Sequence, residues 1–290
     1  MGGALLTNET LIKPNFTVPA DFKLTVLATN WGYPGSVEDF AKRAKDDGYD
    51  GVEHWLPDQA KDRNALMNAL TKHGLKYGFL FGSGEKDFSK NIDNFEKMLA
   101  IGLALKPIFF NSHSGKDFFN ATQAKAFFDL TTKKSKETGI PIYHETHRGR
   151  LCFAAHVTKA YLENNPSLRL TLDISHWCNV HESLLHDQAE TVDLALSRTD
   201  HIHARVGHPE GPQVNDPRAP EWKDALEKHL GWWDKVAEMK AKTTKELTVL
   251  AEFGPVDYMP ALPYTRQPVA NQWEINVYMM KMLRERYKAK

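Results

Sequence analysis

Cysteine is scarce in this sequence, with two among 290 residues. Cys152 and Cys178 are well separated, and two cysteines are too few for the disulfide framework that stabilises many secreted domains. The pattern favours a reduced intracellular chain, although a single bridge between these two residues stays open at this point.

The chain also lacks excess charge and long apolar runs. Its 37 basic residues balance 37 acidic ones, which excludes a general electrostatic attraction to nucleic acid or to an anionic membrane. No run approaches the roughly 18 to 20 apolar residues of a membrane helix. Residues 1–9 lack the basic and apolar regions of a signal peptide, so we expect a cytoplasmic protein; a signal peptide that has been removed is the alternative.

What is present suits one globular domain. With 41% hydrophobic and 26% charged residues, the chain can bury a large core. The chain is long for one small domain, yet single α/β barrels routinely reach this size. We therefore expect one domain whose partner is a small molecule, either as a monomer or as a homo-oligomer.

Strand-like and helix-like segments alternate along the chain eight times, which is typical of a parallel barrel surrounded by helices. The predicted strands are 22–28, 49–55, 75–81, 107–113, 140–144, 168–173, 200–205 and 247–251. The predicted helices are 36–48, 63–73, 92–105, 121–137, 153–164, 186–198, 221–240 and 271–287. The fold class is therefore α/β: a single (β/α)8 TIM barrel over residues 22–290, preceded by an irregular arm over residues 1–21.

Acids and imidazoles directly follow several of these apolar segments. Glu145, Asp173, His203 and Glu252 stand at the ends of the fifth to eighth predicted strands. The first two intervals are each close to one βα unit of about 31 residues, and the third is longer by a proline-rich loop over 207–222. Because active sites of such barrels gather at the carboxyl ends of the strands, we expect the four side chains to share one site.

Three carboxylates and one imidazole form a hard, oxygen-rich ligand set. Such a set predicts one divalent ion, with Mn²⁺ as the first choice and Mg²⁺, Co²⁺ or Zn²⁺ as alternatives. Without a cation, three negative charges packed together would repel one another strongly.

Other polar and aromatic residues are expected at the same mouth of the barrel. The residues that we predict to bind substrate are His176, Arg205, Glu53, His113 and Trp31. Arg205 has two open roles, because it could hold a substrate group or pair with one of the acids. His144 and His147 flank Glu145, and His144, one residue before it, faces the other side of an extended chain. Supporting or rim positions are expected for both histidines.

Several of these motifs resemble those of the xylose isomerase-like sugar phosphate isomerase/epimerase superfamily, over about residues 22–287. The residues that carry the resemblance are Gly48-Tyr-Asp-Gly-Val-Glu53, His113-Ser-Gly, Glu145, Leu172-Asp173-Ile-Ser-His176, His203 and Glu252-Phe-Gly-Pro. The resemblance implies an acid/base pair, Glu145 and Glu252, that also binds the metal, and a substrate contact from His176. It further implies a sugar or sugar phosphate isomerase or epimerase that removes a proton next to a carbonyl and passes through an enediolate held by a divalent ion.

Three alternatives stay open. The same metal site would serve a lyase or dehydratase that acts on a keto-sugar or keto-cyclitol. A hydrolase like the AP endonucleases is less favoured, because that branch needs a further His after the third strand and an Asp-x-His pair after the seventh, and both are missing here. A sugar-binding protein without catalytic activity is the last alternative. Carbohydrate, rather than nucleic acid or membrane, is therefore the expected partner.

Overall fold

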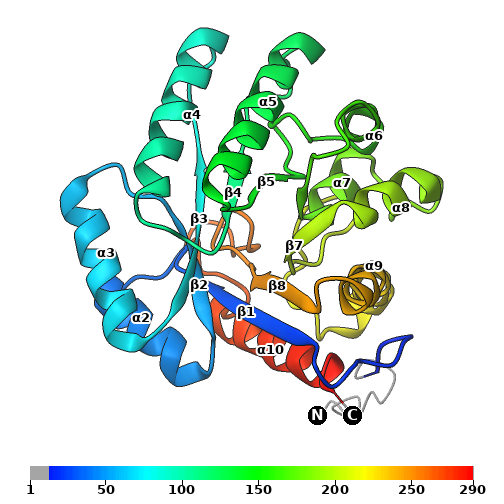
Figure 1. Cartoon of the computed structure of the whole chain (residues 1–290). Coiled ribbons are helices and arrows are strands. Elements are labelled where there is room, and N and C mark those ends of the chain that lie inside the picture. Colours follow the sequence, from blue (N-terminus) through cyan, green and yellow to red (C-terminus); the bar gives the residue numbers. More distant parts are fainter. Residues whose placement is uncertain (1–12, 290) are drawn as a thin grey trace, which may run out of the picture.

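The computed structural model describes residues 13–289. In this part of the chain eight parallel strands close into a barrel in their sequence order, and the helices lie around it (Figure 1). The strands are β1 (Lys23–Thr29), β2 (Gly51–Trp55), β3 (Lys76–Gly82), β4 (Phe110–His113), β5 (Ile142–Glu145), β6 (Leu170–Leu172), β7 (Thr199–His203) and β8 (Glu246–Ala251). The predicted single TIM barrel is confirmed.

The helices connect successive strands and cover the outside of the barrel (Figure 1). They are α2 (Val37–Asp47), α3 (Ala60–His73), α4 (Phe88–Leu103), α5 (Ala121–Thr138), α6 (Ala155–Asn164), α7 (Ile174–Val180), α8 (Ala189–Ser197), α9 (Lys223–Lys242) and α10 (Gln272–Arg286), with a 3-10 turn at Pro220–Trp222. Helix α10 packs on β1 and β8, which pair with each other from Lys23–Glu246 to Ala28–Ala251 and so close the ring.

Local sequence explains where several helices begin and end. Ser36 and Asp39 form a capping box at the start of α2, which satisfies backbone N–H groups that have no partner within the helix. Gly48 ends the same helix with a φ of 98°, a left-handed conformation that glycine adopts at little cost. The capping residues therefore indicate from the sequence where α2 begins and ends.

Helix α7 was not predicted. The sequence pattern ends the sixth strand at Asp173 and indicates no helix before residue 186. In the structure the Asp173 side chain accepts the backbone N–H of Ser175 and starts a helix of seven residues. Ile174, Trp177 and Cys178 are buried, and the helix is too short for an amphipathic period to be recognised. The segment predicted as one helix over 221–240 is instead the 3-10 turn followed by α9.

The N-terminal arm is described only in part. Residues 1–12 of the predicted arm lie outside the described residues, and residues 13–22 contain no helix or strand. The boundary between arm and barrel at residue 22 stays a prediction. Within the described part of the chain, none of the helices combines the length and the apolar character that a membrane span requires.

The interior of the barrel contains a small apolar cluster beneath its polar mouth. Leu27, Phe109 and Leu250 form this buried cluster against Tyr143, separate from the larger core between strands and helices. The ring of Phe109 packs on that of His201, where the apolar cluster meets the polar side chains of the mouth.

The predicted long loop after β7 packs closely on its surroundings. Val206 and Val214 are joined by a backbone hydrogen bond, and both are buried. The Gln213 side chain accepts the N–H of Gly254 at 2.7 Å and donates to its carbonyl at 3.2 Å. The loop after β7 therefore binds the backbone just beyond β8.

His229 of α9 fixes the start of the same loop. Its Nδ1–H donates to the carbonyl of Ala225 at 2.8 Å, and its Nε2 accepts the N–H of Gly207 at 3.2 Å. Both bonds require a neutral ring, and burial lowers the pKa of His229 to about 4.

We expect His229 to make the protein less stable in acid. The unfolded chain takes up a proton on this residue near pH 6.5, whereas the folded chain resists until about pH 4, so stability is lost as pH falls through this window. The loss from this residue should reach on the order of 3 kcal/mol by pH 4. Urea unfolding at pH values from 7 to 4 gives the free energy of unfolding of wild type and of His229→Gln. The difference between the two should shrink by this amount as the pH falls. In the surface variant His186→Gln the free energy of unfolding should depend on pH as it does in wild type. The same pH dependence in His229→Gln would refute this role of His229.

Candidate metal centre

Four side chains from neighbouring strand ends meet at the mouth of the barrel. Glu145 and His203 are the last residues of β5 and β7, and Asp173 and Glu252 directly follow β6 and β8. All four are buried, and one ligand atom from each lies within 4.8 Å of the others. The structure thus brings together the four residues that were predicted from the sequence as metal ligands.

Two atoms at the centre of this group lack hydrogen-bond partners among the described residues. They are Nδ1 of His203 and Oε2 of Glu252, which are 2.8 Å apart with both atoms buried. Oε1 of Glu145 lies 3.7 Å from the same His203 nitrogen. Buried polar atoms are costly to leave unpaired, and a cation among them would satisfy both. The donor set, with three carboxylates and one imidazole, fits a divalent ion.

The electrostatics of the group agree with this reading. Burial raises the pKa of Asp173 to about 6; Arg205 opposes that rise, and the charges of Glu252 and Glu145 add to it. Burial would lower the pKa of His203, but the carboxylates of Glu252, Glu53 and Glu145 hold it well above its ordinary value. The site therefore carries an excess of negative charge that a bound cation would offset.

Arg205 pairs with one of the acids, which is one of the two roles that its position allowed. Its Nη2 donates to Oδ2 of Asp173, and the same nitrogen lies 3.7 Å from Oε2 of Glu252. The guanidinium also stacks on Tyr258 at 4.7 Å and borders the cavity described below. Arg205 thus has its charge neutralised by Asp173 while one surface remains next to the cavity.

A cavity of about 470 Å³ opens directly over Glu145 and Glu252. Among the residues predicted to bind substrate, Trp31, Glu53, His113 and Arg205 line it. His176 does not, because it is fully buried behind Arg205, with its Nε2 2.8 Å from Nη2 of the arginine. The predicted substrate contact of His176 stays a prediction.

Three further residues line the cavity, and the sequence indicates them only weakly or not at all. Trp55 is the last residue of β2, and His147 lies two residues beyond β5, so both lie near ends of strands that the sequence pattern predicts. Tyr258 comes from the loop between β8 and α10, where the sequence has no periodic pattern that would indicate which way a side chain points. Its ring lies 4.8 Å from that of Trp31 and forms an aromatic wall with it.

His144 and Glu145 point to opposite sides of β5, as the alternation predicts. His144 is buried outside the barrel, with Nδ1 2.7 Å from the hydroxyl of Ser114 and Nε2 2.9 Å from that of Thr131. Glu145 faces inward, where its Oε2 accepts the amide N–H of Asn111 at 2.6 Å and lies 3.0 Å from Nε2 of His113. His144 therefore has the supporting position that was expected.

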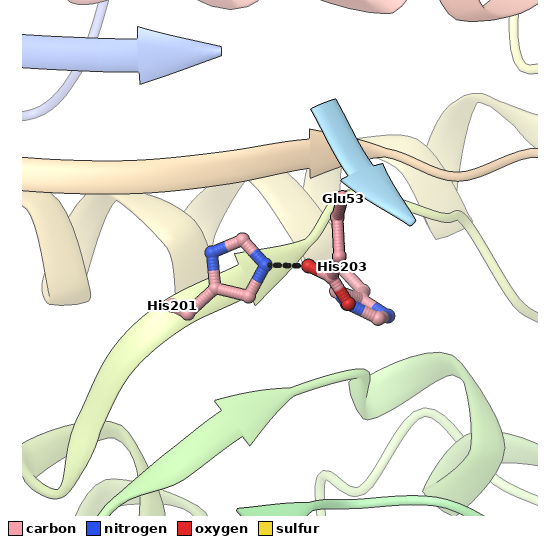
Figure 2. Close-up of side chains that lie close together, drawn as sticks. All are labelled: Glu53, His201 and His203. Carbon is pink, nitrogen blue, oxygen red and sulfur yellow. Dashed lines mark hydrogen bonds and ion pairs between the residues drawn. The ribbon is translucent and has the colours of Figure 1, made fainter. Parts of the chain in front are cut away.

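Glu53 reaches across the barrel interior to two histidines of β7 (Figure 2). Its Oε2 lies 2.7 Å from Nε2 of His201, and its Oε1 lies 3.1 Å from Nε2 of His203. Burial would raise the pKa of Glu53, but the neighbouring imidazoles lower it to about 2. His201 was not selected from the sequence, although its spacing of two residues from His203 places both side chains on the same face of the strand.

Comparison with known proteins supports the fold. The family model described as Xylose isomerase-like TIM barrel matches residues 41–229. The structure is similar to the 3-keto-D-glucoside 4-epimerase YcjR from E. coli, with a TM-score of 0.60, 13% identity and coverage of 90% of this chain and 99% of that chain. It is also similar to the probable 3-DHS dehydratase AsbF from Bacillus anthracis, with a TM-score of 0.58, 16% identity and coverage of 90% and 98%.

A third similar structure is an AP endonuclease of family 2 from Brucella melitensis, with a TM-score of 0.50, 16% identity and coverage of 80% of this chain and 93% of that chain. No curated protein matches the sequence significantly. At these identities the structural likeness establishes a shared fold, whereas the family model covers more than half of the chain. The chain therefore belongs to the xylose isomerase-like TIM barrel family.

Proposed function

We propose that the protein is a divalent-metal-dependent isomerase or epimerase of a sugar or sugar phosphate. The observation that carries the proposal is the placement of two carboxylates at one cavity. Glu145 and Glu252 both line it, and both approach Nδ1 of His203, at 3.7 and 2.8 Å. They come from β5 and β8, which are separated by two strands of the ring, so they reach a common substrate from different directions.

Glu145, Asp173, His203 and Glu252 would hold the ion, with Mn²⁺ as the first choice and Mg²⁺, Co²⁺ or Zn²⁺ as alternatives. A divalent ion supplies Lewis acidity, which lowers the cost of negative charge on a carbonyl oxygen next to the reacting carbon. The four donors come from four successive strand ends, so the barrel itself fixes their relative positions.

The two glutamates have different surroundings, which suits different roles in proton transfer. Oε2 of Glu145 is held by Asn111 and faces His113, so this carboxylate is oriented firmly. Oε2 of Glu252 makes no hydrogen bond among the described residues, so this carboxylate is held less firmly than that of Glu145. In the proposed reaction one glutamate removes a proton from the carbon next to the carbonyl, and the other or the same glutamate returns it to give the isomer or epimer.

The cavity walls fit a small substrate. Trp31, Trp55 and Tyr258 form aromatic surfaces that exclude water from the reacting carbon. A cavity of about 470 Å³ suits a monosaccharide or cyclitol better than a nucleic acid strand. The proposal therefore includes a small-molecule partner and excludes DNA as substrate.

The proposal is tested by solvent-deuterium exchange on a panel of ketoses, aldoses and keto-cyclitols, with and without phosphate, in the presence of Mn²⁺. Deuterium should enter the carbon next to the carbonyl of at least one compound, as observed by NMR and mass spectrometry. A product that has also lost water would assign the protein as a lyase or dehydratase. Turnover without carbon-bound exchange at early conversion would favour a hydride shift, and metal-loaded protein that binds sugars without turning any over would favour a non-catalytic role.

A further inference from the structure

We propose that Glu53 is a positioning residue of the metal centre, which orients His203 so that Nδ1 faces the cation, and that His201 holds Glu53 in place. This inference rests on the metal centre in the proposed function. It differs from the direct substrate contact that the sequence suggested for Glu53.

The first step concerns the two ring nitrogens of His203. Its Nε2 lies 3.1 Å from Oε1 of Glu53, and its Nδ1 lies 2.8 Å from Oε2 of Glu252. Nε2 also lies 3.2 Å from the amide nitrogen of Asn111, but the two N–H groups of that amide can both donate to carboxylates, Oε1 of Glu53 at 3.0 Å and Oε2 of Glu145 at 2.6 Å. A histidine that ligates a metal is neutral, with one N–H and one free lone pair, and a carboxylate can only accept a hydrogen bond. When Glu53 accepts the Nε2–H, the lone pair of His203 is on Nδ1. That nitrogen lies 2.8 Å from Glu252 and 3.7 Å from Glu145, two of the other proposed ligands.

The second step concerns what holds the Glu53 carboxylate. Its Oε1 also accepts the amide N–H of Asn111 at 3.0 Å, and its Oε2 lies 2.7 Å from Nε2 of His201. His201 is fixed at its other nitrogen, because Nδ1 lies 2.8 Å from the hydroxyl and 3.0 Å from the carbonyl oxygen of Thr248 on β8. Because a carboxylate only accepts hydrogen bonds, Nε2 of His201 carries the N–H that donates to Glu53. Both carboxylate oxygens are thus engaged, although the side chain borders the cavity.

The third step concerns the surroundings of this network. Glu53, His201 and His203 are all buried, and the ring of Phe109 lies 4.4 Å from that of His201. Hydrogen bonds of charged groups are strong in such surroundings, and a charge left unpaired there is costly. Glu53 comes from β2 and crosses the interior to reach β7, which is not a neighbouring strand (Figure 2). A contact between a carboxylate and the second nitrogen of a ligating histidine typically sets the orientation and the donor strength of the ring.

The test measures Mn²⁺ affinity by calorimetry on wild type, Glu53→Gln and a matched control. A Gln side chain offers one acceptor oxygen, and its NH₂ group would face an imidazole N–H, so we expect Mn²⁺ to bind roughly 10- to 100-fold more weakly. The visible spectrum of the Co²⁺-loaded protein should shift as well, because the ring of His203 is no longer held. The control is Asp234→Asn, another buried carboxylate with arginine and tyrosine donors, which lies between α9 and α10. It should lower stability without changing the Mn²⁺ affinity.

A measurement on wild type keeps the proposal testable if Glu53→Gln fails to fold. In the Zn²⁺-loaded protein, nitrogen NMR with labelled histidine should show the proton of His203 on Nε2 and the metal on Nδ1. In that state a proton on Nδ1, or metal binding through Nε2, would overturn the proposal. Equal Mn²⁺ affinity and an unchanged Co²⁺ spectrum in Glu53→Gln would overturn it too.

Failure of the positioning role can be separated from failure of the metal centre. Asp173→Asn alters a proposed ligand directly. If wild type binds Mn²⁺ and Asp173→Asn binds it poorly while Glu53→Gln binds normally, the metal centre stands and the role of Glu53 is refuted. If wild type and Asp173→Asn bind Mn²⁺ equally weakly, both proposals are refuted.

Discussion

Replacing Glu252 by Gln is expected to slow carbon–proton exchange by about 10²- to 10⁴-fold, because positioned acid/base groups typically contribute that much to rate. Gln keeps the size of the side chain but cannot accept and return a proton. Glu145→Gln should have an effect of the same order, since the proposed reaction uses carboxylates on both sides of the substrate. Exchange is followed by NMR in deuterated solvent with whichever compound the substrate panel identifies.

Loss of metal could imitate this result, because both glutamates are also proposed ligands. Metal content must therefore be measured on each sample, and rates compared at equal occupancy. Glu246→Gln is a suitable control, because this exposed residue lies on β8 at the opposite end from Glu252 and its carboxylate forms a surface ion pair with Lys23. Full exchange activity in metal-loaded Glu145→Gln and Glu252→Gln would rule out the two-glutamate mechanism.

Mn²⁺ at 1,000 times its dissociation constant should raise the free energy of unfolding by about 4 kcal/mol, provided that it binds only the folded chain. In the folded state the cation also relieves repulsion among Glu145, Asp173 and Glu252, which are buried within 4.8 Å of His203 and of one another. Urea unfolding with and without Mn²⁺ measures the gain, and metal analysis of the saturated protein should give about one ion per chain.

Asp173→Asn serves as the paired variant for this measurement. It removes one negative ligand, so the gain at the same Mn²⁺ concentration should be much smaller. A stability gain that is equal in wild type and in a variant lacking all four proposed ligands would place the ion elsewhere on the protein. An absence of any gain in wild type would contradict the metal centre itself.

The sequence predicts most of the barrel and the arrangement of Glu145, Asp173, His203 and Glu252, for one physical reason. Parallel strands have their carboxyl ends at the same edge, so polar residues that follow apolar strands must converge. Alternation along β5 likewise sends His144 and Glu145 to opposite faces of the strand. These inferences require only that side chains alternate along a strand and that the strands of the sheet are parallel.

Other features depend on contacts that no local pattern records. Tyr258 enters the cavity from an irregular loop, and α7 is too short and too buried to show an amphipathic face. The pairing of Glu53 with His201 joins residues from β2 and β7, which are separated by two other strands of the ring. The sequence left two roles for Arg205, a contact with substrate or a pair with one of the acids. Its hydrogen bond to Asp173 depends on tertiary packing, which the sequence does not show.

The link between Gln213 and Gly254 has a consequence for altering the specificity of this barrel. Both hydrogen-bonding groups of the Gln213 amide are used on the Gly254 backbone, two residues beyond Glu252. Grafting a foreign segment in place of residues 207–219 alone would remove this amide, and the backbone just beyond Glu252 would lose both hydrogen bonds. The two segments that follow β7 and β8 should therefore be exchanged together, as a single cassette, when the protein is redesigned or recombined with a relative.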